Sequence, residues 1–91
     1  MNKNELIDRV TERTGLRKKD VSMVTAAVFG CIADALAQEE KVTIAGFGVM
    51  ELRHRAARKG HLPIDKREVD IPAAKIPVFR PSKQLKEKVN A

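Results

Sequence analysis

The sequence predicts an α+β fold, with helices in its first half and antiparallel strands in its second, and a chain that dimerises. Apolar residues recur at helical spacing before residue 38. From residue 42 to about residue 55 apolar and polar residues alternate around a glycine-flanked turn, and the residues from 68 to 80 are extended and contain prolines. The 91 residues suffice for one small domain. We therefore expect a single domain over residues 1–91, with a helical base over about 1–40, a sheet and arm over about 41–80, and a C-terminal helix over about 82–90.

The first helix is predicted from Asn2 or Lys3 to about Thr14, where apolar residues fall on one face. Asn2 can cap its first turn, with Glu5 at the capping-box position, and Gly15 suits the residue just past its end.

A second helix is predicted from about Lys18 to Ala37, and it is apolar around most of its circumference. Such a helix must be covered on more than one side, which a chain of this length does incompletely, so we expect a second chain to complete a shared core. The alternative is a monomer with this helix at its centre. The residues predicted to form the dimer core are Val28, Phe29, Ile32, Leu36, Phe47 and Phe79.

The strand region begins with a predicted hairpin, in which Val42–Ile44 pairs with a strand from Val49 to about Arg55 and Phe47 is an inward anchor in the turn. Residues 53–61 and 69–75 can then pair as the legs of a longer hairpin whose tip is 62–66.

The rest of the chain is predicted as an extended segment followed by a short helix. Because Pro72 and Pro77 cannot donate to a ladder, the extended segment is expected to be an edge strand or irregular at those points. A helix over 83–89 follows, with Ser82 as its N-cap and with Leu85 and Val89 as its apolar contacts.

The net charge of +6 lies in residues 51–91, because the bases and acids of residues 1–50 cancel. It is concentrated in the segment 53–67, where an apolar point formed by Leu62, Pro63 and Ile64 is surrounded by bases. A cationic segment favours a polyanion as partner, and an apolar tip on it suggests a wedge between base steps. The alternative is a basic surface kept for solubility.

Other classes of function find little support. His54 and His61, the only histidines, have no further ligands at metal spacing beside them, and Gly46-Phe47-Gly48 lacks the features of a phosphate loop. We expect no catalysis, metal, cofactor or small-molecule substrate. The single cysteine, Cys31, is predicted to be a buried hydrophobe. No segment approaches the run of about 18 apolar residues that crosses a bilayer, so we expect a soluble intracellular protein without a membrane partner.

Several motifs together resemble the bacterial histone-like HU family over the whole chain. They are MNKNELI at the start, GFG at 46–48, RAARKG at 55–60, Pro63, IPAAK at 71–75 and FRPSKQLK at 79–86. The resemblance implies an intertwined homodimer with a helical base, a three-stranded antiparallel sheet forming a saddle, and one long β-hairpin arm per chain. A heterodimer with a paralogous chain stays open.

The resemblance also implies the function and the residues that serve it. We expect architectural, largely sequence-independent binding, bending and compaction of double-stranded DNA in the cytoplasmic nucleoid, with the arms in the minor groove. A sequence-preferring bender similar to integration host factor, or an RNA-binding accessory protein, are the alternatives. Pro63 matches the intercalating wedge, with Leu62 and Ile64 beside it. The predicted DNA-binding residues are Arg53, Arg55, Arg58, Lys59, His61, Pro63, Lys66, Arg67, Lys75, Arg80, Lys83, Lys3 and Lys86.

The tip departs from the family pattern, with His61-Leu62 before the proline and Asp65-Lys66 after it. Two interpretations stay open: Leu62 and Ile64 strengthen the wedge, or they pack across the hairpin. His61 also suggests binding that tightens as the pH falls through about 6.5.

Overall fold

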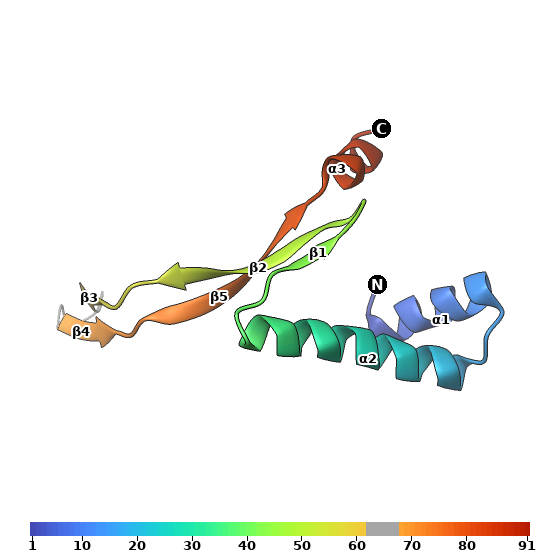
Figure 1. The fold of residues 1–91 in the computed structure, drawn as a ribbon, viewed down its shortest axis with the longest axis horizontal. Coiled ribbons are helices and arrows are strands. Elements are labelled where there is room, and N and C mark those ends of the chain that lie inside the picture. Colours follow the sequence, from blue (N-terminus) through green and yellow to red (C-terminus); the bar gives the residue numbers. More distant parts are fainter. Residues whose placement is uncertain (62–67) are drawn as a thin grey trace. The chain divides into compact units, whose positions relative to one another are not determined.

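The computed structural model describes residues 1–61 and 68–91, which form two compact units, Met1–Ala35 and Leu36–Ala91. Within these described residues the elements are two helices, five strands and a final helix, in the order α1, α2, β1 to β5, α3 (Figure 1). The mixture of helices with antiparallel sheets confirms the predicted α+β class.

The first unit is built from α1 (Lys3–Thr14) and most of α2 (Lys18–Ala37), both with the predicted bounds. The backbone N–H of Glu5 donates to Oδ1 of Asn2 at 2.9 Å, so Asn2 is the N-cap. Gly15 ends the helix in the left-handed region at φ 71°, and its N–H donates to the carbonyl of Thr11. Local chemistry therefore fixes both ends of α1.

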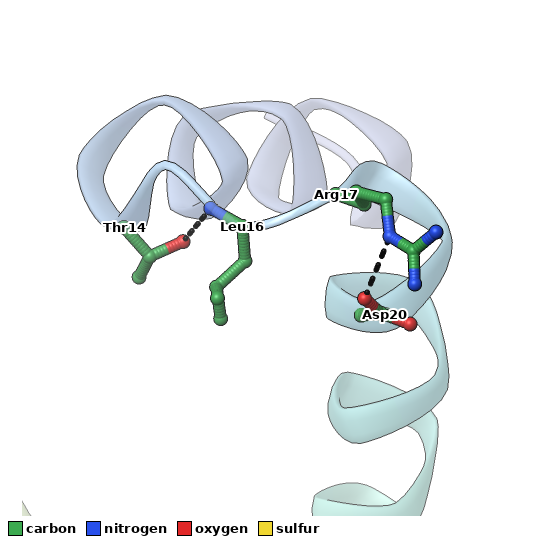
Figure 2. Close-up of polar contacts among 4 residues, drawn as sticks. All are labelled: Thr14, Leu16, Arg17 and Asp20. Atoms are coloured by element: carbon green, nitrogen blue, oxygen red, sulfur yellow. Dashed lines mark hydrogen bonds and ion pairs between the residues drawn. The ribbon is translucent and has the colours of Figure 1, made fainter.

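The turn between α1 and α2 is held by polar side chains (Figure 2). The N–H of Leu16 donates to Oγ1 of Thr14 at 3.3 Å, and Nε of Arg17 lies 3.2 Å from Oδ2 of Asp20. The N–H of Val21 donates to the carbonyl of Arg17, which starts α2, and the carboxylate of Asp20 lies in its first turn, where the helix dipole favours it.

The core of the first unit is small. Ile7 of α1 and Val21 of α2 are the buried hydrophobic residues of the described chain, each 3% exposed. Much of α2 is exposed, including Val28 and Phe29 at 50% and 53%. Cys31 is exposed as well, so the prediction of a buried cysteine is wrong for the single chain.

The helix α2 is also long and apolar enough, by length and composition, to cross a membrane. The prediction that no segment reaches that threshold is therefore wrong. That prediction considers only unbroken apolar runs. The apolar run of α2 is interrupted by Ser22, Thr25, Gly30 and Asp34, and the mean hydropathy of the helix nevertheless stays high.

The second unit holds a three-stranded antiparallel sheet, as predicted, and its strand order is β1-β2-β5. Its strands are β1 (Val42–Ile44), β2 (Gly48–Arg55) and β5 (Ala74–Pro81). The helix α3 (Lys83–Val89) follows β5, and its N-cap Ser82 accepts from the N–H of Leu85 at 3.1 Å. The expected apolar contact of Val89 is wrong in this chain, because Val89 is 75% exposed.

A long hairpin extends from this sheet. After a break, β3 (Arg58–His61) pairs with β4 (Glu68–Ile71) as a two-stranded ladder. Arg55 pairs with Ala74 before the break and Arg58 with Ile71 after it, so each leg adds the same number of residues and the register continues. Within this unit β3 and β4 lie at one end of the long strands and α3 at the other (Figure 1).

Pro72 and Pro77 lie where a missing N–H is tolerated. Pro72 falls in the break between β4 and β5, and Pro77 lies in β5, an edge strand, as predicted. The predicted hairpin tip, residues 62–66, lies outside the described residues.

The turn between β1 and β2 is closed by aromatic packing. The rings of Phe47 and Phe79 lie 5.4 Å apart between centroids, and the N–H of Ser82 donates to the carbonyl of Phe47 at 2.8 Å. Phe47 thus anchors the turn to β5, although half of its surface stays exposed.

Candidate nucleic-acid interface

The register of the sheet brings predicted DNA-binding arginines onto one face. Successive residues of a strand point to opposite faces, and directly paired residues share a face. Arg53 and Arg55 of β2 therefore lie on the same face as Arg80 of β5, which pairs with Val49. All three arginines are exposed. We call this side, with Arg53, Arg55 and Arg80, the charged face.

An acid on the charged face orients one of these arginines. Nε of Arg80 lies 2.6 Å from Oε1 of Glu51, whose side chain is 28% exposed while that of Arg80 is 62% exposed. The geometry is that of a charge-assisted hydrogen bond. Sequence reasoning does not single out this partner, because Glu51 and Arg80 are brought together only by the β2–β5 register.

The opposite side of the sheet is largely apolar. Its residues, which we call the apolar face, are Val42, Ile44, Met50, Leu52, Pro77 and Phe79. At the arm end of this side His54 pairs with Lys75. Lys75, another predicted DNA-binding residue, therefore lies on the face opposite Arg53 and Arg55. Nζ of Lys75 lies 3.3 Å from Oε1 of Glu39.

The hairpin carries further bases beyond the sheet. Arg58 and Lys59 of β3 are exposed, and Lys59 is paired in register with Asp70 of β4. An Nη atom of Arg55 lies 3.5 Å from the carbonyl oxygen of Pro72, so Arg55 reaches across the break. Bases therefore follow one another from β2 into β3 along a single leg.

The remaining predicted residues of the hairpin fall near its predicted tip. His61 ends β3. Pro63, Leu62, Ile64, Lys66 and Arg67 lie outside the described residues.

Comparison with known proteins decides the family. The family model described as bacterial DNA-binding protein matches residues 1–90. The chain belongs to this family. It is 51% identical to the DNA-binding protein HU of Geobacillus stearothermophilus over 98% of this chain and 99% of that protein.

Solved structures agree with the sequence relationship. An Anabaena HU–DNA cocrystal structure matches with a TM-score of 0.90 at 40% identity, covering 98% of this chain and 97% of that one. HU from Thermotoga maritima matches with a TM-score of 0.70 at 39% identity, covering 98% of both chains. The predicted HU resemblance is thereby confirmed.

As a member of the bacterial DNA-binding protein family, the chain is no enzyme, as predicted. Within the described residues no group of three or more His, Cys, Asp or Glu could hold a metal ion.

The remaining described lysines among the predicted DNA-binding residues of this family member, Lys3, Lys83 and Lys86, lie on helices. Lys3 is the first residue of α1 and Lys83 the first of α3. Nζ of Lys83 is 3.9 Å from Oε1 of Glu87, and Lys86 is exposed on the same helix. Lys83 and Lys86 thus lie on a different element of the second unit from the arginines of the charged face.

The residues predicted to form a dimer core are incompletely covered by this chain. Val28, Phe29, Phe47 and Phe79 are exposed, the last at 44%. Ile32 and Leu36 are half-buried. Each unit thus leaves large apolar side chains exposed, and contiguous exposed apolar side chains mark interaction sites.

Proposed function

We propose that this chain is an architectural DNA-binding protein that binds, bends and compacts double-stranded DNA in the bacterial nucleoid with little sequence preference. The observation that carries the proposal is the continuity of exposed bases, from Arg53 and Arg55 on the charged face to Arg58 and Lys59 in the hairpin. The Anabaena relative crystallised with DNA supports the same ligand.

The spacing of these side chains suits a phosphate backbone. Arg53 and Arg55 stand two residues apart on one face, about 6.7 Å at the usual rise of a strand. Each guanidinium can donate two parallel hydrogen bonds to a phosphate. Contacts to phosphates fix the position of a protein on the duplex but read no sequence. Sequence preference should therefore be weak and should follow the deformability of the DNA.

The aromatic residues favour duplex over single strands as the ligand. The chain has three phenylalanines and no tryptophan or tyrosine. Phe47 and Phe79 pack against each other, and Phe29 lies in α2. None of the three lies in the hairpin, so a platform for stacking bases finds no support among them. The deep, narrow major groove of double-stranded RNA is also a poor match for a β-hairpin.

The exposed apolar residues support a homodimer as the binding unit. A second copy would cover Val28 and Phe29 of α2 and would bring a second hairpin to the same DNA. In this proposal the arms enter the minor groove and Pro63 forms the wedge that kinks a base step. That part of the proposal rests on the sequence, because Pro63 lies outside the described residues.

The experiment measures binding and bending together. The protein is titrated into end-labelled duplexes of random and chosen sequence, a nicked duplex and double-stranded RNA, at several salt concentrations. Anisotropy reports affinity, and energy transfer between the duplex ends reports bending. We expect the affinity for DNA to fall steeply with salt, with a slope of log affinity against log salt of about −0.9 for each phosphate neutralised. We also expect tighter binding to the nicked duplex and a shorter distance between the duplex ends.

Arg53→Gln together with Arg55→Gln should flatten the salt dependence without changing sequence preference. A saturated duplex with unchanged end-to-end distance would contradict the proposal. A strong preference for one chosen duplex would instead indicate a sequence-preferring bender.

A further inference from the structure

A strained acidic residue lies at the root of the hairpin. Glu39 follows α2, and its N–H donates to the carbonyl of Leu36 at 2.9 Å. Its φ of 61° is in the left-handed region, and it is the non-glycine residue that adopts a positive φ among residues 1–61 and 68–91. Residues other than glycine adopt this conformation at a cost of about 1 kcal/mol or more. Strain of this kind often accompanies a functional constraint.

The Glu39 side chain meets two bases from the two long strands. Its Oε1 lies 3.3 Å from Nζ of Lys75 in β5 and 3.6 Å from Nε2 of His54 in β2. His54 and Lys75 are paired directly in the ladder, so a single carboxylate contacts both strands at one register position. We call these three residues the root cluster.

The root cluster lies where the hairpin leaves the sheet. Lys75 is one residue from Ala74, which pairs with Arg55 at the end of the β2–β5 ladder. The side chains of Glu39, Lys75 and His54 are half-exposed or more, at 51%, 55% and 65%. A solvated Lys75 is therefore accessible to an external anion as well as to Glu39.

From this arrangement we infer that Glu39 competes with DNA phosphates for Lys75, and so lowers DNA affinity and moderates its salt dependence. The inference rests on the proposed function. A phosphate that reaches Lys75 must displace a carboxylate already in place, and the displaced carboxylate then takes up a cation from solution. Part of the counterion release that drives DNA binding is thereby cancelled.

The expected size follows from the exposure of the pair. Exposed ion pairs contribute about 0.2–1 kcal/mol, and one tenfold change in affinity corresponds to about 1.4 kcal/mol. Removing the competitor should therefore tighten DNA binding by about 1.4- to fivefold. It should also make the slope of log affinity against log salt more negative, by up to about 0.9 for each Lys75 released to a phosphate.

The test compares two single substitutions that remove one negative charge from adjacent positions. Glu39→Gln keeps the size of the side chain and the backbone strain. Glu40→Gln is the control, because Glu40 is exposed and has no ion pair with any other described residue. Both full-length proteins are titrated into the same random duplex at several salt concentrations, after their melting curves have been checked against wild type.

We expect Glu39→Gln to bind more tightly than Glu40→Gln and to show the steeper salt slope. In a Lys75→Gln background the gain from Glu39→Gln should shrink. If the two acidic variants behave alike while wild type binds and bends the duplex, the competition is disproved and the proposed function stands. The competition is also disproved if Glu39→Gln tightens DNA binding as much in the Lys75→Gln background as it does in wild type. If wild type fails to bind the duplex, both fail.

Discussion

Substituting Gly48 by alanine should strongly destabilise the sheet. A Cβ built at Gly48 would lie 2.5 Å from the carbonyl oxygen of Arg80 and 2.6 Å from Cε1 of Phe79. The first contact is with backbone and cannot be relieved by a rotamer change. The second is with a ring of the Phe47–Phe79 pair. Relief therefore requires β2 and β5 to separate where Gly48 pairs with Pro81.

The magnitude combines two costs. Overpacking of a well-packed site costs about 1–3 kcal/mol, and disruption of an aromatic pair costs about 0.5–1.5 kcal/mol. We expect a loss of about 2–4 kcal/mol in the free energy of unfolding, which corresponds to a fall of at least about 8 °C in Tm for a domain of this size. Thermal melting followed by circular dichroism at a fixed protein concentration measures it.

Gly30→Ala is the matched control for this substitution. Gly30 lies inside α2, and a Cβ there meets nothing within 4 Å. Alanine in a helix interior is favoured over glycine by about 0.5–1 kcal/mol, so this variant should melt slightly above wild type. If Gly48→Ala melts together with wild type, the close approach of β5 to Gly48 is not as described and the reasoning is refuted.

Four further substitutions test three separate features of the molecule. Arg53→Gln should weaken binding equally for all duplex sequences and reduce the slope of log affinity against log salt by about 0.9 for each phosphate that is no longer neutralised. Anisotropy titrations measure both effects, with Lys19→Gln as the control. A weakening that depends on the duplex sequence would refute a pure phosphate contact. Ser82→Ala should lower the free energy of unfolding by about 1 kcal/mol because it removes the α3 cap, and an unchanged denaturation midpoint would show that α3 adds nothing to stability. Leu62→Ala and Ile64→Ala should weaken binding to a nicked duplex if these residues strengthen the wedge, whereas unchanged affinity would leave them as packing residues.

Elements fixed by neighbouring residues could be predicted from the sequence. The Asn2 cap, the Gly15 terminus and the Ser82 cap each depend on residues within a few positions, and all three predictions are confirmed. The alternation that places Arg53 and Arg55 on one face of β2 also follows from the period of a strand.

Contacts between distant residues could not be predicted in this way. The Arg80–Glu51 pair and the root cluster join residues that only the β2–β5 register and the turn after α2 bring together. Nothing in the local sequence distinguishes Glu39 from its neighbour Glu40. The strain at Glu39 is likewise a property of the folded backbone, because the sequence at that position would permit an ordinary helical end.

The apolar character of α2 is better explained by a second protein chain than by a membrane. By length and composition alone, α2 is suited either to cross a membrane or to lie in a protein core. A membrane span would account for α2 but not for the sheet, where Ile44 and Phe79 of the apolar face are also exposed, at 41% and 44%. A second copy would cover apolar surface in both units at once. The lysines and the aspartate in the first turn of α2, and Asp34 near its end, would also be costly within a bilayer. A dimer therefore explains the exposed apolar residues of α2 and those of the apolar face together, whereas a membrane explains only the first.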